Sequence, residues 1–393
     1  MSEMFGVLIP EELDSTLDMQ NGNAICCKFN RWGTLIAVGG TDGRVYIFDF
    51  VTKGMVKNLL AHVAPVTSLS WSRDGRKLLS ASSDTTIIIW DVLSGTVAHK
   101  LKYPTIITYA AFNPRDDNKV IVLQINMPPT VDTIQPPSKR TLIHDIPGSA
   151  DDVISCVTYD RKAKYILCGT AKGKVVVFDA DTYKCLNWGR QNSVQQIRQI
   201  VCASKGGLCL TSSQDRIIRT YNVEDLVNCV RGNIIESKLK LQDLVNKIYW
   251  KSACTDADGY FICAASCKNN LMYIWESSSG SLMKILEFPK GEVLHEVQWH
   301  PTRCVILSVA QSAVSIWAQA HVENWSAFAP EFRELEENMK YEEKEGEFDM
   351  EDEDTEDTDK QNDPKNSDEL IDVVTVGKDS VLASSDEVGP STS

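Results

Sequence analysis

The sequence predicts an all-β fold, a seven-bladed β-propeller followed by an acidic, largely disordered C-terminal tail. Two observations carry this prediction. A β-rich run that ends in an aromatic residue returns at nearly regular intervals through residues 1–321, and the balance of charge changes abruptly after them. The chain has 393 residues, which is more than one compact core of roughly 300 residues usually holds. A repeated architecture avoids that limit.

The repeated endings share a β-branched or apolar residue, an aromatic residue and usually a polar one. They are Ile47-Phe48-Asp49, Ile89-Trp90-Asp91, Val177-Phe178-Asp179, Thr220-Tyr221-Asn222, Ile274-Trp275-Glu276 and Ile316-Trp317-Ala318. Successive aromatics are 42, 88, 43, 54 and 42 residues apart. The gap of 88 is two periods, so a diverged unit is expected between Asp91 and Val153, which makes seven units. A period of about 42 to 45 residues with a Trp-Asp ending is typical of WD-repeat propellers with four-stranded blades.

Each unit is predicted to run strand, turn, strand, turn, strand. The second unit gives strands at Thr67–Trp71, Lys77–Ser82 and Thr86–Trp90, and the diverged unit gives Ile107–Phe112 and Lys119–Leu123. The runs Ile87–Ile89 and Val175–Val177 are apolar at consecutive positions. Such runs indicate strands that are covered on both faces, as they are between stacked blades.

The second unit also contains a set of polar side chains that resembles a catalytic triad. The set is His62, a serine at Ser80 or Ser82, Asp84 and Trp90. In a WD repeat these residue types form an internal hydrogen-bonded tetrad, so we expect them to fix a turn and a strand rather than to catalyse a reaction.

Other motifs favour a protein that is not an enzyme and needs no metal or cofactor. Gly169–Lys174 is one residue short of a phosphate-binding loop, and Val175 follows where that motif needs Ser or Thr. The twelve cysteines show no Cys-x-x-Cys spacing and are expected to be reduced core thiols. The first residues lack the pattern of a secretion signal, and no apolar run approaches the roughly 18 residues of a membrane span.

The unit between Tyr221 and Trp275 is about eleven residues longer than its neighbours. The extra segment includes Glu236–Asn246, which we expect to be a short helix or an extended loop lying across the propeller. It either covers apolar surface or contacts a partner. Basic residues gather in this part of the chain at Arg216, Arg219, Lys238, Lys240, Lys247, Lys251, Lys268 and Lys290. They are interpreted as a solvated rim or, because residues 1–321 carry a net charge of +4, as a nucleic-acid-binding face.

Residues 322–393 contain 24 acidic and 6 basic residues, a net charge of −18. The segment 322–330 includes Trp325 and Phe328 and is expected to pack on the propeller as a junction. Residues 331–393 form the predicted disordered tail, since Glu342–Asp368 has too few apolar residues to fold alone. The apolar island that starts at Leu370 is expected to bind a partner.

Several segments together resemble the retinoblastoma-binding protein 5 family, the WD-repeat subunits of COMPASS-type complexes that methylate a lysine near the start of histone H3. They are Phe29–Leu35, Trp71–Gly75, Lys240–Asn246, Val314–Gln319, Val322–Pro330, the acidic box after Glu347 and the island at Leu370. The chain departs from some members in ending at Ser393 and in its strongly diverged third unit.

The resemblance implies three linear sites in the tail. Glu331–Lys344 would contact and activate the catalytic SET domain, Glu347–Asp354 would bind the SPRY-domain subunit, and Asp368–Val376 would bind a second WD-repeat propeller. The residues implied for the SET contact are Phe332, Leu335, Tyr341, Glu342 and Glu343. Those for the SPRY contact are Glu347, Phe348, Asp349, Met350, Glu351, Asp352, Glu353 and Asp354. Those for the second propeller are Ile371, Asp372, Val373, Val374, Thr375 and Val376.

The resemblance also implies that basic side chains of the late blades face nucleosomal DNA, at Arg219, Lys247, Lys268 and Lys290. The last three are lysines where the family has arginines, which keeps the charge and loses the two-pronged geometry of a guanidinium on phosphate. The expected function is therefore a nuclear, non-catalytic scaffold and activator that bridges a SET-domain methyltransferase, a SPRY-domain subunit, a second WD-repeat protein and the nucleosome. The alternative is a substrate adaptor of a ubiquitin ligase, which would bind its partners through the blades instead of the tail.

Overall fold

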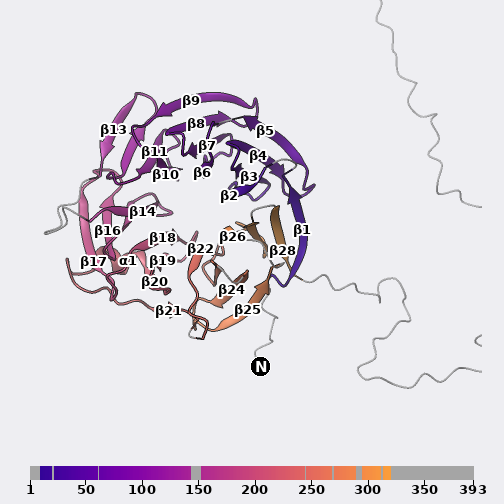
Figure 1. Cartoon of the computed structure of the whole chain (residues 1–393). Helices are drawn as coiled ribbons and strands as arrows, with labels where there is room; N and C mark the ends of the chain where they lie inside the picture. The colour runs from indigo at the N-terminus through magenta and orange to yellow at the C-terminus, as the bar shows by residue number, and fades with distance from the viewer. Residues whose placement is uncertain are drawn as a thin grey trace, which may run out of the picture. The chain divides into compact units, whose positions relative to one another are not determined.

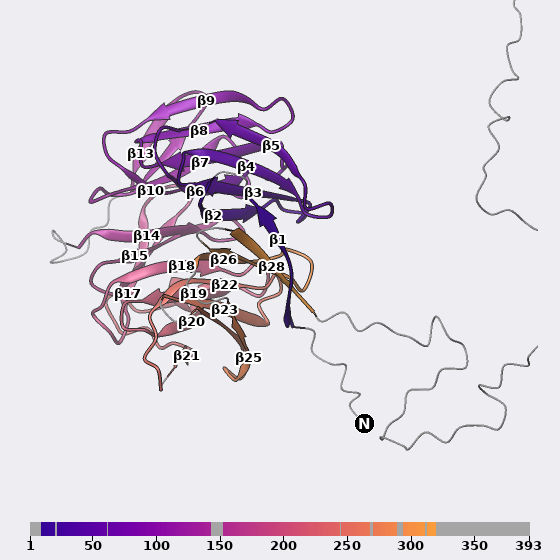
Figure 2. The ribbon, with the colours of Figure 1, turned by 45° about the vertical axis from the view of Figure 1, so that its right-hand side comes forward.

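The computed structural model describes residues 9–19, 22–60, 62–142, 152–243, 245–267, 270–288, 294–310 and 313–319. The chain divides into two units, Met1–Glu323 and Asn324–Ser393, and all described residues lie in the first. They form seven four-stranded antiparallel sheets arranged as blades around a central axis, which confirms the predicted propeller (Figures 1 and 2).

Within each blade the strands follow one another from the axis outward. The first blade contains β2 (Ala24–Phe29), β3 (Leu35–Gly40), β4 (Arg44–Asp49) and β5 (Met55–Leu60). The second contains β6 (Val66–Trp71), β7 (Lys77–Ser82), β8 (Thr86–Asp91) and β9 (Thr96–Lys102). The third contains β10 (Ile107–Phe112), β11 (Lys119–Gln124), β12 (Thr130–Thr133) and β13 (Ser138–Thr141).

The later blades have the same order. The fourth contains β14 (Ile154–Tyr159), β15 (Tyr165–Thr170), β16 (Lys174–Asp179) and β17 (Cys185–Arg190). The fifth contains β18 (Ile197–Cys202), β19 (Leu208–Ser213), β20 (Ile218–Asn222) and β21 (Leu239–Leu241). The sixth contains β22 (Trp250–Thr255), β23 (Phe261–Ser266), β24 (Leu271–Glu276) and β25 (Leu282–Glu287). The seventh contains β26 (Leu294–Trp299), β27 (Ile306–Ala310), β28 (Ala313–Ala318) and β1 (Glu12–Asp18).

The seventh blade closes the ring with strands from both ends of the described chain. β1 pairs antiparallel with β28, with Glu12 opposite Ala318 and Asp18 opposite Ala313. The carboxylate of Glu296 on β26 also accepts a hydrogen bond of 3.1 Å from the amide of Cys27 on β2. Because β1 belongs to the seventh blade and precedes β2 in the chain, the seventh blade contains the segment that leads into the first.

The apolar strand runs are buried on both faces, as the sequence predicts. The side chains of Ile87–Ile89 and Val175–Val177 are all 2% exposed or less. Neighbouring blades share each of these surfaces, because every cluster of buried side chains draws residues from two adjacent sheets. The diverged third unit keeps all four strands, and its outer pair β12 and β13 is only four residues long in each strand.

The extra segment of the fifth unit begins with a short helix, α1 (Val223–Asn228), which lies before the predicted span Glu236–Asn246. The chain then runs along β17, the outer strand of the fourth blade, where the amide of Arg190 donates to the carbonyl of Asn233 at 2.9 Å. Gly189 allows this approach, since a Cβ there would lie 2.4 Å from Ile235. The segment returns to its own blade as β21, so the described residues of Glu236–Asn246 contain a short strand and no helix.

Candidate functional site

Four polar side chains of the second blade form the hydrogen-bonded tetrad that the sequence predicts. His62 places Nδ1 3.0 Å from Oδ2 of Asp84 and Nε2 2.9 Å from Oγ of Ser80. The indole N–H of Trp90 donates to the same hydroxyl across 3.0 Å, which makes Ser80 the serine of the set. Burial lowers the pKa of His62 even though Asp84 acts to raise it. The tetrad is enclosed and fixes the turn to the strand, which confirms its structural role.

Two of the basic residues of the late blades, Arg216 and Lys247, lie at the same end of the fifth blade. Leu241 at the end of β21 pairs with Ile218 at the start of β20, so the turn before β20 and the connection after β21 meet at the same end of the blade. We call this end the connection face, because it contains the segments that lead from each blade to the next. The turn between the first and second strands of each blade lies at the opposite face.

Arg219 lies near the connection face but is not exposed there. It is the second residue of β20, opposite Thr211, and only 3% of the residue is exposed. Its guanidinium forms an ion pair with Asp215 and donates to Oγ of Ser213 at 3.4 Å. The prediction that Arg219 contacts a DNA phosphate is therefore wrong in this structure, because the charge is buried and already paired.

Repeat alignment gives the reason for this error. Arg219 pairs with Thr211 as Ile88 pairs with Ser80 in the second blade, so it occupies a position that is buried in both repeats. Counting residues from the aromatic ending of each unit could have revealed the equivalence, since Arg219 and Ile88 each lie two residues before that aromatic.

Lys247 is exposed on the connection between β21 and β22, and Arg216 lies beside it on the turn before β20. The guanidinium of Arg216 donates to the hydroxyl of Tyr249 at 2.8 Å and lies 4.4 Å from the centre of its ring. The indole of Trp250 donates to the backbone carbonyl of Arg216 at 2.9 Å. These contacts hold the turn that contains Arg216 against the connection that contains Lys247. Arg216 belongs to the predicted basic cluster but was not expected to be one of the DNA contacts.

Asp243 holds the loop that presents Lys247. Its Oδ1 accepts hydrogen bonds from the amides of Val245 and Asn246 at 2.8 and 2.9 Å, and its Oδ2 accepts one from the hydroxyl of Tyr273 at 2.8 Å. The bonds from Asn246 are the main cause that lowers the pKa of Asp243 to about 2. The carboxylate is thus ionised at neutral pH, and the loop is fixed to the sixth blade through Tyr273.

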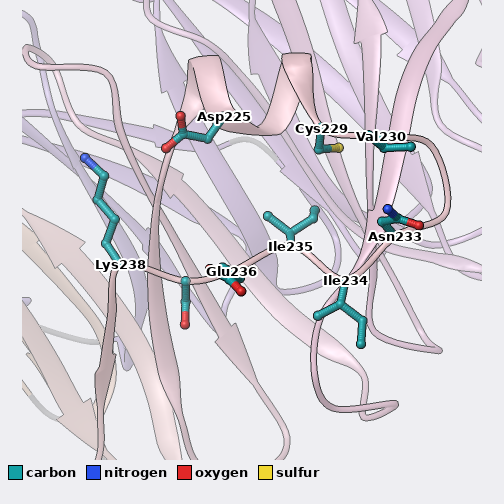
Figure 3. Close-up of a pocket in the computed structure, with 9 residues that line it drawn as sticks. Asp225, Cys229, Val230, Asn233, Ile234, Ile235, Glu236 and Lys238 are labelled. Carbon is teal, nitrogen blue, oxygen red and sulfur yellow. The ribbon is translucent and has the colours of Figure 1, made fainter.

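A cavity of about 510 Å³ lies between α1 and the segment that follows it (Figure 3). Ile235 points toward the helix and is 6% exposed, whereas Ile234 points away and is 61% exposed. The remaining lining residues are Asp225, Cys229, Val230, Asn233, Glu236, Ser237 and Lys238. Ile235 packs with Leu226 and Cys209 in the core between the fourth and fifth blades, so the segment covers apolar surface, one of its two predicted roles.

The other predicted site residues lie outside the described residues. These are Lys268 and Lys290 on the late blades, the junction 322–330 and the three linear sites of the tail. Among the residues that the structure does describe, no group of three or more His, Cys, Asp or Glu side chains could hold a metal ion. The same part of the chain contains no helix long and apolar enough to cross a membrane.

Comparison with known proteins places these features in a family. The model of the WD domain, G-beta repeat, matches residues 13–49 and 54–91. Retinoblastoma-binding protein homolog 5 of Caenorhabditis elegans is 55% identical over 389 residues, which are 98% of this chain and 85% of that protein. This chain belongs to the retinoblastoma-binding protein 5 family. The family's homolog in Drosophila melanogaster is 43% identical over 98% of this chain and 79% of that protein.

Fungal relatives of this retinoblastoma-binding protein 5 family member extend the likeness. The Set1 complex component swd1 of Schizosaccharomyces pombe is 35% identical over 88% of this chain and 87% of that protein. The solved β-propeller domain of Cps50 (Swd1) from Myceliophteria thermophila superposes with a TM-score of 0.72 at 28% identity, over 79% of this chain and all of that domain.

Proposed function

We propose that this member of the retinoblastoma-binding protein 5 family is a nuclear, non-catalytic subunit of a COMPASS-type histone H3 lysine methyltransferase complex. In this role it bridges the SET-domain enzyme, the SPRY-domain subunit, a second WD-repeat protein and the nucleosome. The observation that carries the proposal is the 55% identity to a homolog over 98% of the chain, because a match of that extent includes tail as well as blades. Relatives named as a Set1 complex component and as COMPASS component SWD1 support it.

In this proposal the tail supplies the contacts with the other protein subunits, and the propeller is a rigid base that also faces the nucleosome. The box Glu347–Asp354 has six carboxylates around Phe348 and Met350. A basic groove with an apolar pocket on the SPRY-domain subunit fits that composition, since charge guides the encounter and a buried aromatic side chain supplies much of the affinity. The segment Glu331–Lys344 places Phe332, Leu335 and Tyr341 among acidic residues and is assigned to the SET domain.

The apolar island of the tail is assigned to the second propeller. Changing Val373 and Val374 together to Asp should reduce capture of that propeller by more than 100-fold, because burial of each β-branched side chain contributes about 1.5 to 3 kcal/mol. Capture of the SPRY-domain subunit should stay unchanged. Both are measured by pull-down of purified subunits with the full-length chain.

A matched control changes Val381 and Leu382 to Asp, which adds the same charge outside the island. That variant should capture both partners normally. If the island variant loses both partners together, the two tail sites are not independent. If both variants capture the second propeller normally and binding depends on the blades, the proposal gives way to the ubiquitin-ligase adaptor.

The connection face is assigned to nucleosomal DNA. Lys247 and Arg216 lie on neighbouring loops there, and the expected contacts Lys268 and Lys290 belong to the same part of the sequence. Arg219 is omitted because Asp215 already neutralises its guanidinium. Phosphate contacts by these basic side chains would position the complex without reading base sequence.

Changing Lys247, Lys268 and Lys290 together to Ala should weaken nucleosome binding and leave methylation of a free histone H3 peptide unchanged. Each lost phosphate contact should reduce the slope of log affinity against log salt by roughly 0.9. Fluorescence binding to labelled nucleosomes over a salt series measures both quantities.

The matched control for this experiment uses exposed lysines of the opposite face. Lys162, Lys184 and Lys205 are all exposed on turns at that end of the blades. Changing these three to Ala removes the same net charge and should leave the salt slope as it is. An equal loss of activity on nucleosomes and on free peptide in the connection-face variant would contradict a DNA contact and indicate a subunit contact.

A further inference from the structure

Two pairs of cysteines lie directly opposite each other on neighbouring strands in the described part of the chain. Cys202 on β18 is opposite Cys209 on β19, and Cys254 on β22 is opposite Cys263 on β23. All four are free thiols. The pairs occupy the first two strands of adjacent blades, at neighbouring positions of the same strand-turn-strand unit. They therefore provide a natural comparison within one molecule.

The backbone ladder distinguishes the two pairs. The amide of Ala203 donates to the carbonyl of Leu208 at 2.8 Å, so that pair is hydrogen-bonded. Hydrogen-bonded and non-hydrogen-bonded pairs alternate along an antiparallel ladder. The next pair inward, Cys202 with Cys209, is therefore a non-hydrogen-bonded pair.

In the sixth blade the amide of Asp256 donates to the carbonyl of Phe261 at 3.1 Å. The pair of Cys254 with Cys263 lies two steps further along the ladder, so it is again a hydrogen-bonded pair. The two cysteine pairs thus differ by one step in the ladder.

This difference decides which pair can form a disulfide. A disulfide needs Cβ atoms about 3.5 to 4.5 Å apart. Opposed Cβ atoms in an antiparallel sheet are about 4.5 to 5.5 Å apart, and non-hydrogen-bonded pairs take the shorter value. The Cβ atoms of Cys202 and Cys209 are therefore expected near the upper limit for a disulfide, whereas those of Cys254 and Cys263 lie beyond it and their strands would have to move together.

Burial gives the same ranking. Cys202 is partly exposed, while Cys209 and Cys263 are fully buried and Cys254 is 8% exposed. The neighbouring Cys202 thiol and burial together raise the pKa of Cys209 well above the ordinary value for cysteine. Cys209 therefore stays protonated, and Cys202 is the thiol of this pair that a small oxidant can reach.

We propose that Cys202 and Cys209 form a redox modification site that a peroxide converts to a cross-strand disulfide. In the first step the Cys202 thiol releases its proton and the thiolate attacks one peroxide oxygen. The O–O bond breaks to give a sulfenic acid and hydroxide, which takes up the released proton to form water. In the second step the sulfur of Cys209 attacks the sulfenic sulfur, and the hydroxyl leaves as water with the thiol proton. The two thiols are oxidised by two electrons and one hydrogen peroxide is reduced to two water molecules.

The test oxidises the folded full-length chain with hydrogen peroxide, alkylates the remaining thiols in denaturant, and digests the protein with trypsin without reduction. Cleavage after Lys205 separates the two cysteines, so a disulfide joins the peptides Gln199–Lys205 and Gly206–Arg216. Mass spectrometry should find this linked pair at least tenfold more abundant than any disulfide within Ser252–Lys268, the peptide that contains Cys254, Cys263 and Cys267.

Two variants and one control make the result decisive. Cys202→Ser should abolish the linked pair, and Cys254→Ser should leave it unchanged. Oxidation in denaturant should remove the tenfold preference, because the preference comes from the folded ladder. Full alkylation of both Cys202 and Cys209 after peroxide treatment, or a disulfide of Cys254 that forms as readily, would overturn the proposal.

Discussion

A chain that ends at Pro330 should melt like the full-length protein and should fail to stimulate methyl transfer by the SET-domain enzyme. Every described strand lies before residue 319, so the truncation removes none of the described strands. In our proposal, stimulation depends on Glu331–Lys344, which binds the active arrangement of the SET domain better than the inactive one. A partner can shift a two-state equilibrium only through such a difference in affinity. Thermal unfolding and a methylation assay on histone H3 peptide measure the two properties.

A peptide that covers residues 330–360 should restore part of the stimulation when the SPRY-domain subunit is present. The same peptide with Phe332→Ala and Tyr341→Ala keeps the acidic charge and should restore none, because the aromatic contacts are lost. Full stimulation by the truncated propeller alone would place the activating surface on the blades.

Changing Leu17 to Asp should open the ring and destabilise the propeller severely. Leu17 is 1% exposed and packs with Val314 and Ile316 on β28 at the point where the ring closes. Loss of its burial costs about 1.5 to 3 kcal/mol, and a buried carboxylate without a partner adds several more. Native domains are stable by only about 5 to 15 kcal/mol, so we expect a fall in melting temperature of more than ten degrees and aggregation through the exposed edge of β28.

Leu13 on the same strand is the matched control. It is 43% exposed, so Leu13→Asp makes the same chemical change where water can solvate the charge. This variant should melt within a few degrees of the unchanged protein. Differential scanning calorimetry and size-exclusion chromatography distinguish the two, and equal melting temperatures for both variants would show that β1 contributes little to closure.

Much of the fold could be predicted from the periodicity of the sequence. The aromatic endings and the runs of consecutive apolar residues mark strands that are buried in the same way in each blade. The tetrad was predictable for the same reason, except for the choice of Ser80 over Ser82, which depends on which way each side chain points from β7. The position of α1 could not be predicted from the sequence. The helix Val223–Asn228 is stabilised by packing of Val223 and Leu226 on the fourth blade, which is a contact between distant segments of the chain.

The basic face was predicted from charge and from the family resemblance, and neither of them gives the exposure of a side chain. Arg219 and Lys247 are both cations in the same region of the sequence, yet one completes a buried ion pair with Asp215 and the other is exposed. The pairing of Arg216 with Tyr249 joins residues 33 positions apart, so only the folded chain reveals it. The assignment of the tail residues to their proposed contacts rests on the resemblance to the family.

The pairing of β1 with β28 also sets an order in time. Asp18 leaves the ribosome about 295 residues before its partner Ala313, and synthesis proceeds at roughly 5 to 20 residues per second. The first strand to be made therefore waits on the order of 15 to 60 s for the last one. During that interval six blades can form while the ring stays open, so the nascent chain presents unpaired apolar surface to chaperones until translation has passed residue 318.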